Sequence, residues 1–408
     1  MSSVSEPTLQ PPSAALYPDR FGAPRADSRR TSIGFLVRSL AYGGAERQLV
    51  TLATALHARG HRVIVMPFYA NGPLEAELRE AGVRVRGLEK RGRWDVTAFL
   101  TRLHAVIREE RLEILHGYLG IPNIVASVMR AAFPRIKVVW GERASNMDLS
   151  HYDWLSRASA LLARTLSRFP DLIIVNSRAG FEHVVRSGYP RKHVVVIPNG
   201  IDTQRFAPDP AARRRLRRVW NVGDEERLIG LVGRLDPVKD HRTFLTAAAM
   251  LTAQHEHLRF VCVGDGDPRY ARAMRSAARE LGLGESITWV GARSDMSAVY
   301  NAFDIACSSS ESEGFPNVVA EAMACGVPCV VTDVGDSAWV LGRPASVAPP
   351  GDPRAFADRI ADLLAAGSRE SAAIGGAGRE RIITFFSIAA LIHNTERAIA
   401  GVVVRRPA

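Results

Sequence analysis

The strongest chemical signal is the stretch Glu313–Glu321, which reads Glu-Gly-Phe-Pro-Asn-Val-Val-Ala-Glu and follows an apolar segment predicted to be a buried strand. The Gly-Phe-Pro turn and Asn317, a predicted N-cap, indicate that a helix begins here. The N–H groups of Val318 and Val319 would then face outward, where the helix dipole stabilises a phosphate. Glu321 is placed to accept hydrogen bonds from a ribose, and Glu313 from sugar hydroxyls. Either glutamate alone is more often simply solvated, but the combination favours a ligand site.

A second group of candidate residues, Gly233-Arg234-Leu-Asp-Pro-Val-Lys239, follows the first predicted strand of the second half. The planar guanidinium of Arg234 suits a diphosphate, and Lys239 adds a point charge at the start of the next helix. Charged loop residues are usually just solvated, yet Lys239 is one of only four lysines in the chain. The two cations together predict a pocket that neutralises a leaving nucleotide.

A glycine pair, Gly43-Gly44, lies between the first predicted strand and the first predicted helix. Glycines there let the backbone approach a ligand closely, as phosphate-binding and sugar-binding loops require. A plain tight turn explains the pair equally well, so the pair alone is a weak signal.

The scaffold that positions these residues is predicted from hydrophobic periodicity. From residue 31 onward, short apolar runs alternate with amphipathic stretches such as Glu46–Arg59, which is typical of doubly wound parallel sheets. A turn-rich segment around Pro198 marks a domain border. The predicted parts are a disordered tail (1–30), one α/β domain (31–205), a second α/β domain (206–385) and a C-terminal helix (386–408) that packs back toward the first domain. We expect the two domains to face a cleft.

Composition narrows the class of protein. Hydrophobic residues make up 47% and charged residues 23%, as in globular proteins. A net charge of +11 attracts nucleic acid, anionic membranes or polyphosphates, but the 53 basic residues are nearly all arginines spread along the chain, so we expect no nucleic-acid partner. The four cysteines lie in apolar stretches without the paired spacing of a zinc site. Because no apolar run is long enough for a signal peptide or a membrane span, we expect a cytoplasmic protein.

Taken in order, these motifs resemble those of the retaining family-4 glycosyltransferases with the GT-B fold. The resemblance covers about residues 31–400 and includes Gly43-Gly44-Ala45-Glu46-Arg47, Asn176-Ser177, Ile197-Pro-Asn-Gly-Ile-Asp202, Gly233-Arg234, Lys239, Val263-Gly-Asp-Gly266 and Glu313–Glu321. It implies two Rossmann-like domains, an N-terminal one that binds the acceptor and a C-terminal one that binds a UDP- or GDP-linked sugar. The acceptor is expected to be a glycan or a lipid-linked molecule in polysaccharide or glycolipid synthesis.

The resemblance also implies roles for individual residues. Arg234 and Lys239 would hold the diphosphate, and Glu313 the sugar hydroxyls, as catalytic residues. The expected donor-binding residues are Gly43, Gly44, Gly233, Gly264, Arg293, Gly314, Phe315, Pro316, Asn317, Val318 and Glu321, with Glu321 on the ribose and the backbone near Arg293 beside the base. On the acceptor side we expect Tyr118 and Arg143.

One position departs from the family pattern. Many relatives carry His-x-His at the end of the fourth strand, whereas this chain reads His116-Gly117-Tyr118. A phenol hydrogen-bonds a sugar oxygen but is a poor base near neutral pH, given an ordinary pKa of about 10. For His116 we favour a core-facing side chain, because it would reach the sugar only from the opposite face of the strand.

The expected reaction leaves negative charge on the diphosphate as an oxocarbenium-like centre forms on the sugar. Fixed positive groups lower that barrier. The resemblance implies retention of configuration, and because the sequence offers no clear nucleophile, we favour same-face attack in which the leaving phosphate takes the proton of the acceptor. No metal or cofactor is expected. Two alternatives stay open: a sugar-nucleotide epimerase, and a catalytically silent sugar-nucleotide-binding protein, the latter suggested by Tyr118.

Peripheral membrane contact, at the inner face of the membrane, is a further hypothesis. Residues 153–169 place leucines and Phe169 near one face and arginines elsewhere, as a surface-lying helix does. A helix that packs on its own sheet has the same pattern, and we favour that interpretation.

Overall fold

The computed structural model describes residues 30–92, 94–143 and 154–403, and these form two compact units. One unit is Ile201–Ser387, and the other combines the described parts of Pro12–Gly200 and Ile388–Ala408. The chain therefore passes from one unit to the other near the predicted domain borders. Apart from Arg30, the predicted disordered tail lies outside the described residues.

The unit that contains the N-terminal half is built on a seven-stranded parallel sheet in the order β3-β2-β1-β4-β5-β6-β7. Its strands are β1 (Ser32–Val37), β2 (Arg62–Pro67), β3 (Arg84–Val85), β4 (Ile114–Tyr118), β5 (Lys137–Glu142), β6 (Leu172–Val175) and β7 (Val194–Val196). Both faces of the sheet are buried. Successive residues of a strand point to opposite faces, and Phe35 belongs to the core on one face while Leu36 belongs to the core on the other.

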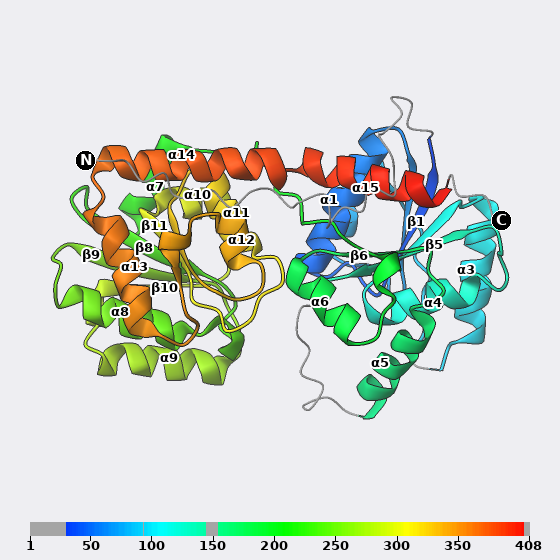
Figure 1. The fold of residues 1–408 in the computed structure, drawn as a ribbon, viewed down its shortest axis with the longest axis horizontal. Helices are drawn as coiled ribbons and strands as arrows, with labels where there is room; N and C mark the ends of the chain where they lie inside the picture. The colour runs from blue at the N-terminus through cyan, green and yellow to red at the C-terminus, as the bar shows by residue number, and fades with distance from the viewer. Residues whose placement is uncertain (1–29, 93, 144–153, 404–408) are drawn as a thin grey trace. The chain divides into compact units, whose positions relative to one another are not determined.

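Helices cover both faces of this sheet, as Figure 1 shows. They are α1 (Gly44–Ala58), α2 (Glu75–Glu80), α3 (Thr97–Glu109), α4 (Gly120–Met129), α5 (Trp154–Leu166), α6 (Arg178–Arg186) and the C-terminal α15 (Ile388–Val403). Helix α15 packs against α1 and contributes Leu391 and Ile399 to the same core. The last helix of the chain thus completes the unit that its first strand began.

The Ile201–Ser387 unit contains a six-stranded parallel sheet in the order β10-β9-β8-β11-β12-β13. Its strands are β8 (Arg227–Val232), β9 (Leu258–Val263), β10 (Ile287–Val290), β11 (Ile305–Ser308), β12 (Cys329–Thr332) and β13 (Val347–Ala348). One face is covered by α8 (His241–Thr252), α9 (Pro268–Glu280) and α13 (Pro353–Ala365), and the other by α7 (Pro210–Val219), α10 (Met296–Ala302), α11 (Asn317–Ala324), α12 (Ser337–Leu341) and α14 (Ser368–Phe385).

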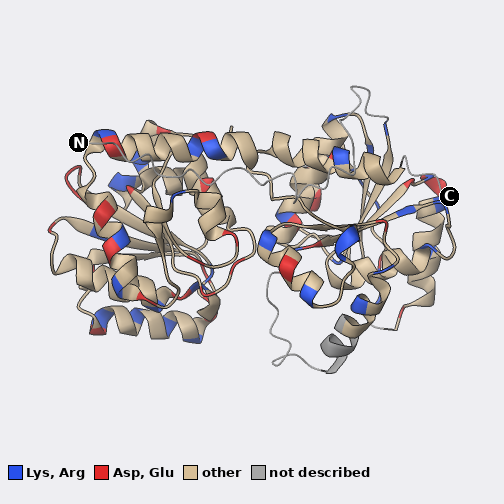
Figure 2. Ribbon diagram, in the orientation of Figure 1, with Lys and Arg blue, Asp and Glu red and all other residues tan. Residues whose placement is uncertain are grey.

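Both sheets therefore have the doubly wound order of a Rossmann-like domain, in which the chain reverses direction beside the first strand of the sheet. The reversal lies between β1 and β4 in one unit and between β8 and β11 in the other. Figure 2 shows Lys and Arg interspersed with Asp and Glu over the helices of both units. None of the described helices is both long and apolar enough to cross a membrane.

Candidate donor-binding site

The predicted donor-binding residues of the Ile201–Ser387 unit lie beyond the carboxyl ends of β8, β9, β10 and β11, and the strand order reverses between β8 and β11. Gly233 and Arg234 follow β8 directly, and Ser309 and Ser310 follow β11. The two strands are paired neighbours, with Cys307 opposite Leu231. In open α/β sheets ligands bind at this kind of reversal point.

Lys239, Glu313 and Ser310 form the polar centre of this site. The Lys239 Nζ lies 2.5 Å from the Glu313 Oε1, and the Ser310 hydroxyl donates to the same oxygen at 2.8 Å. The side chains of Lys239 and Glu313 are only 21% and 11% exposed. The structure therefore brings together two residues that the sequence placed 74 positions apart, and it pairs them with each other.

The loop that carries Arg234 and Lys239, the two predicted phosphate-binding cations, is held by hydrogen bonds from within the unit. The short 3-10 helix Pro237–Lys239 is capped by the Asp236 carboxylate, and the Ser309 hydroxyl donates to the carbonyl oxygens of Lys239 and Asp240. A side chain at Gly233 would meet the aliphatic stem of Lys239 at 3.4 Å, so the lysine runs directly over this glycine. Lys239 is thus held in place before any ligand binds.

Arg234 differs from Lys239 in being open to solvent. Its side chain is 77% exposed, and its ion pair with Asp236 is long, at 3.5 Å. An exposed pair of this kind contributes little stability. The guanidinium is therefore available to reorient toward an anion.

Gly264 and Gly266 allow the loop after β9 to lie against the loop after β8. A side-chain carbon at Gly264 would come within 2.0 Å of the Gly233 carbonyl oxygen, and Gly264 has a φ of +143°, which favours glycine. At Gly266 the same carbon would lie 2.2 Å from the Leu235 carbonyl oxygen. Gly264, predicted to bind the donor, thus also shapes the backbone that carries Arg234.

Arg293 lies beyond the end of β10, and its guanidinium makes a two-pronged ion pair with Asp295, at 2.7 and 2.6 Å. The neighbouring Ala292 N–H donates to Asp265 at 2.9 Å. The backbone near Arg293, predicted to lie beside the base, is therefore tied to the same loop as Gly264.

Helix α11 begins differently from the prediction. Pro316 occupies the N-cap position and Asn317 is the first helical residue, so Asn317 is not the N-cap. The Val319 N–H donates to the Pro316 carbonyl at 3.1 Å and does not face outward as predicted. The Val318 N–H has no such backbone bond among the described residues. Because proline supplies no side-chain acceptor, this end of the helix still offers a donor to an anion.

The turn before α11 is set by the core and by a second loop. Phe315 is 5% exposed and its ring packs on Phe386, so only its backbone can reach a ligand. The Gly314 carbonyl accepts from the Asp336 N–H at 3.1 Å. Any side chain at Gly335, where φ is +55°, would collide with the Glu313 carbonyl. This packing fixes the backbone at Glu313 and Gly314.

Glu321 faces a buried tyrosine that the sequence reasoning did not identify. The Tyr300 hydroxyl, on α10, donates to the Glu321 Oε2 at 2.7 Å. Ser310 was likewise missed as a partner of Glu313. A serine three residues before the glutamate is a recognisable signal, whereas the contact from Tyr300 depends on how two helices pack.

In the other unit, Tyr118 and Arg143 lie together at the carboxyl ends of β4 and β5. The Arg143 guanidinium carbon is 4.8 Å from the centre of the Tyr118 ring, and Arg143 also donates to Asn199. Tyr118 is 1% exposed, and burial, partly offset by the charge of Arg143, raises its pKa to about 12. The phenol therefore stays protonated and cannot act as a base near neutral pH.

His116 is completely buried, as predicted, with its ring 5.0 Å from that of Phe35. Burial and then the Arg143 charge lower its pKa to about 3, so the imidazole stays neutral. It nevertheless lies on the same face of β4 as Tyr118, because residues two apart on a strand share a face, and the two rings lie 5.8 Å apart.

Gly43 is the N-cap of α1, and Gly44 its first residue. A side-chain carbon at Gly43 would lie 2.2 Å from the Glu46 Oε2. The carboxylate of Glu46 therefore lies directly over Gly43.

Glu142, beside Arg143, is an unusual carboxyl group that the sequence did not single out. Burial raises its pKa to about 7, partly offset by hydrogen bonds from Asn123, at 3.0 Å, and from Tyr189. Its ionisation thus changes near neutral pH.

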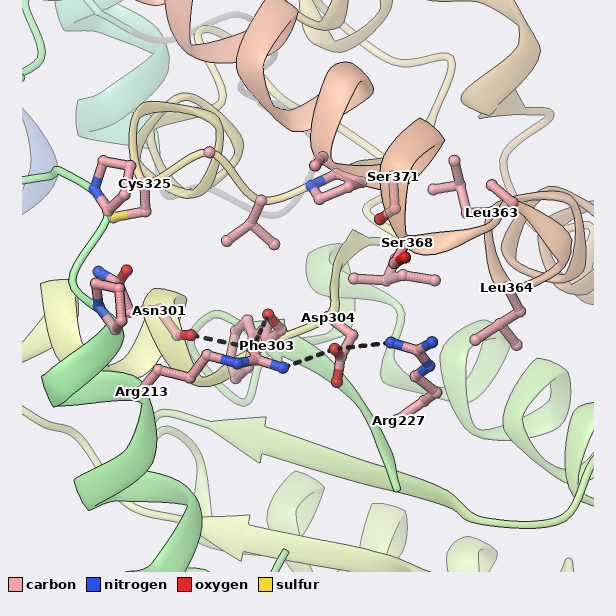
Figure 3. A pocket seen from close by; sticks show the side chains of 18 of the residues that line it. Arg213, Arg227, Asn301, Phe303, Asp304, Cys325, Leu363, Leu364, Ser368 and Ser371 are labelled. Carbon is pink, nitrogen blue, oxygen red and sulfur yellow. Dashed lines mark hydrogen bonds and ion pairs between the residues drawn. The ribbon is translucent and has the colours of Figure 1, made fainter. Parts of the chain in front are cut away.

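A cavity of about 320 Å³, shown in Figure 3, lies at the amino ends of β8, β11 and β12. The predicted donor-binding residues of this unit follow the carboxyl ends of the strands, at the opposite edge of the sheet. The charged floor of the cavity is an internal network centred on Asp304. The carboxylate of Asp304 accepts from Arg213 at 2.7 Å and from Arg217 at 2.9 Å, and Arg227 lies 3.5 Å away. Arg213 also donates to three carbonyls at the end of α10. All of these charged groups are thus paired within the protein, and we interpret the network as one that stabilises the fold.

No group of three or more potential metal ligands among His, Cys, Asp and Glu occurs in the described part of the chain. The four cysteines are free and buried in the Ile201–Ser387 unit, as expected for core residues. Burial raises the pKa of Cys325 to about 12, so it is not a reactive thiolate.

Comparison with protein families gives two matches in chain order. Residues 42–205 match the family described as Glycosyltransferase Family 4, and residues 226–366 match Glycosyl transferases group 1. The chain is 29% identical over 336 residues to a GDP-mannose-dependent alpha-mannosyltransferase of Mycobacterium tuberculosis (strain CDC 1551 / Oshkosh), covering 79% of this chain and 83% of the relative. It is 28% identical over 356 residues to a D-inositol 3-phosphate glycosyltransferase of Corynebacterium jeikeium, again covering 79% and 83%.

Solved structures show the same fold. The structure of Anabaena HepE in complex with UDP superposes with a TM-score of 0.79 at 22% identity, covering 90% of this chain and 98% of that one. A glycosyltransferase from Rickettsia africae gives a TM-score of 0.80 at 18% identity, covering 93% and 100%. With two Rossmann-like units and both family matches in order, the chain belongs to the family-4 glycosyltransferases of the GT-B fold.

Proposed function

We propose that this glycosyltransferase moves a hexose from a UDP- or GDP-linked donor to an acceptor hydroxyl with retention of configuration and without a metal ion. The observation that carries the proposal is the pairing of Lys239 with Glu313 beside Gly233-Arg234. Two cations and the start of α11 converge where a diphosphate fits the reversal point of the sheet. The GDP-mannose dependence of one relative and the UDP bound to HepE support this class of donor.

In the proposed reaction the anomeric C–O bond to the diphosphate breaks while the acceptor oxygen bonds to the same face of the sugar, and the acceptor proton passes to the leaving phosphate. Arg234, Lys239 and the Val318 N–H stabilise the charge that develops on that phosphate. Glu313 is already engaged by Lys239 and Ser310, which suits a residue that orients sugar hydroxyls better than one that attacks the anomeric carbon.

We assign acceptor recognition to the unit that contains Arg143 and Tyr118. The acceptor is a glycan or a lipid-linked molecule, and one relative is named as a phosphatidylinositol monomannoside mannosyltransferase.

Helix α5 and the following turn expose Leu161, Leu162 and Phe169, at 64%, 47% and 51%, beside the exposed Arg164 and Arg168. This combination fits an anionic lipid surface. Cosedimentation with vesicles that contain phosphatidylglycerol, lost in a Leu161→Ser/Leu162→Ser variant, tests the contact.

A thermal-shift screen with UDP, GDP and their sugars identifies the donor, and the double variant Arg234→Gln/Lys239→Gln then tests the site. We expect it to lose donor binding and at least a hundredfold in transfer rate. The matched control Lys192→Gln/Arg215→Gln removes the same two charges from exposed positions and should behave as the unaltered protein. Unchanged donor affinity and turnover in the first variant refute the proposal, as does tight donor binding without any transfer.

A further inference from the structure

Tyr300 links the apolar core of the Ile201–Ser387 unit to the edge of the donor site. Its side chain is 1% exposed, and its hydroxyl donates to the Glu321 Oε2 at 2.7 Å. A hydrogen bond from a buried hydroxyl to a carboxylate is charge-assisted and stronger than one between neutral groups. Burial, and then the Glu321 charge, raise the Tyr300 pKa well above its ordinary value, so the hydroxyl remains a donor throughout the working pH range.

The position of the Tyr300 ring is set by packing. The rings of Phe206 and Phe303 make edge contacts with it at 5.9 and 6.3 Å between centres. Its neighbour Asn301 donates to the carbonyls of Ala207 and Ser297, which fixes the end of α10. The hydroxyl is therefore a rigid point.

Glu321 lies half-buried on the neighbouring helix α11. A glutamate side chain has several rotamers, and the bond from Tyr300 favours the one that brings Oε2 to the tyrosine hydroxyl. Because an ionised carboxylate has about four acceptor positions, it can still receive the two hydroxyls of a ribose.

We infer that Tyr300 is the positioning residue for recognition of the donor ribose, because it holds the Glu321 carboxylate in the orientation that receives the 2′ and 3′ hydroxyls. The inference deepens the proposed function and rests on it. Tyr300 does not touch the nucleotide and acts only through Glu321.

The test measures the affinity of the full-length protein for UDP and GDP, and for the 2′-deoxy form of whichever binds. Tyr300→Phe keeps the ring and removes only the hydroxyl. We expect it to weaken the ribonucleotide about fivefold to tenfold, and the deoxynucleotide much less. The donor KM should rise by the same factor, with kcat little changed. In a Glu321→Ala background the same substitution should have no further effect, since coupled residues give non-additive changes.

Tyr270→Phe is the matched control, because the Tyr270 hydroxyl contacts only the His241 N–H, at 3.4 Å, among the bonds described for it. Tyr270→Phe should leave unchanged the ratio of the affinity for the ribonucleotide to the affinity for its 2′-deoxy form. If Tyr300→Phe weakens both nucleotides equally, or acts as strongly in the Glu321→Ala background, Tyr300 serves packing alone and the inference fails. If the unaltered protein binds the nucleotides but Glu321→Ala leaves the ratio intact, the ribose assignment fails. If it binds none of them, the proposed function itself fails.

Discussion

Replacing Glu313 by Gln should have opposite effects on nucleotide binding and on sugar transfer. Gln keeps the shape and still accepts from Ser310, but it removes the charge that lies 2.5 Å from the Lys239 Nζ. Unit charges about 4 Å apart attract by about 4 kcal/mol at an effective dielectric constant of about 20. Under the proposed function, this attraction competes with the diphosphate for Lys239 in the unaltered protein.

If about a third of that attraction becomes available to the diphosphate, Glu313→Gln should bind UDP or GDP about tenfold more tightly by calorimetry. Transfer should nevertheless slow by about a hundredfold, because the sugar hydroxyls lose a charged partner. Glu311→Gln removes an exposed carboxylate two residues away and should change neither quantity. If Glu313→Gln weakens the nucleotide as strongly as it slows transfer, the carboxylate mainly holds Lys239 in place, and the reasoning about competing charges is wrong.

Four further outcomes are expected. Gly264→Ala should lower the free energy of unfolding by about 1–3 kcal/mol and raise the donor KM, because its side chain would collide with the Gly233 carbonyl; an unchanged KM would separate this glycine from the Arg234 loop. Asp304→Asn should cost about 3–5 kcal/mol in urea unfolding, since it leaves the buried Arg217 without its carboxylate, whereas the exposed Asp224→Asn should cost almost nothing. Because the pKa of Glu142 is raised to about 7 in the folded protein, the unfolded chain loses this proton at a lower pH than the folded protein does, and the free energy of unfolding should fall as pH rises from about 4.5 to about 7 and then level off. Glu142→Gln should remove this pH dependence of stability. A variant with the same pH profile as the unaltered protein would contradict the assignment. Turnover should survive EDTA, and its loss, restored by a divalent cation, would overturn the metal-independent mechanism.

The sequence by itself determined the fold class and the approximate division of the chain. Apolar runs alternate with amphipathic stretches because parallel strands buried on both faces need apolar side chains throughout, while each covering helix needs only one apolar face. The motifs after β8 and β11 could be assigned to one site for a related reason. Residues that follow neighbouring parallel strands lie at the same edge of the sheet, however far apart they are in the chain.

Only the tertiary structure decided which side chains pair within that edge. Lys239 and Glu313 were predicted as separate contacts to phosphate and sugar, and the structure joins them because the 3-10 turn at Pro237–Lys239 is fixed against Ser309. The bond from Tyr300 to Glu321 depends on the packing of α10 against α11, which no local pattern encodes. Periodicity is a property of neighbours in the chain, whereas hydrogen-bond partners are set by the distances between helices and loops, and these become defined only when the core packs.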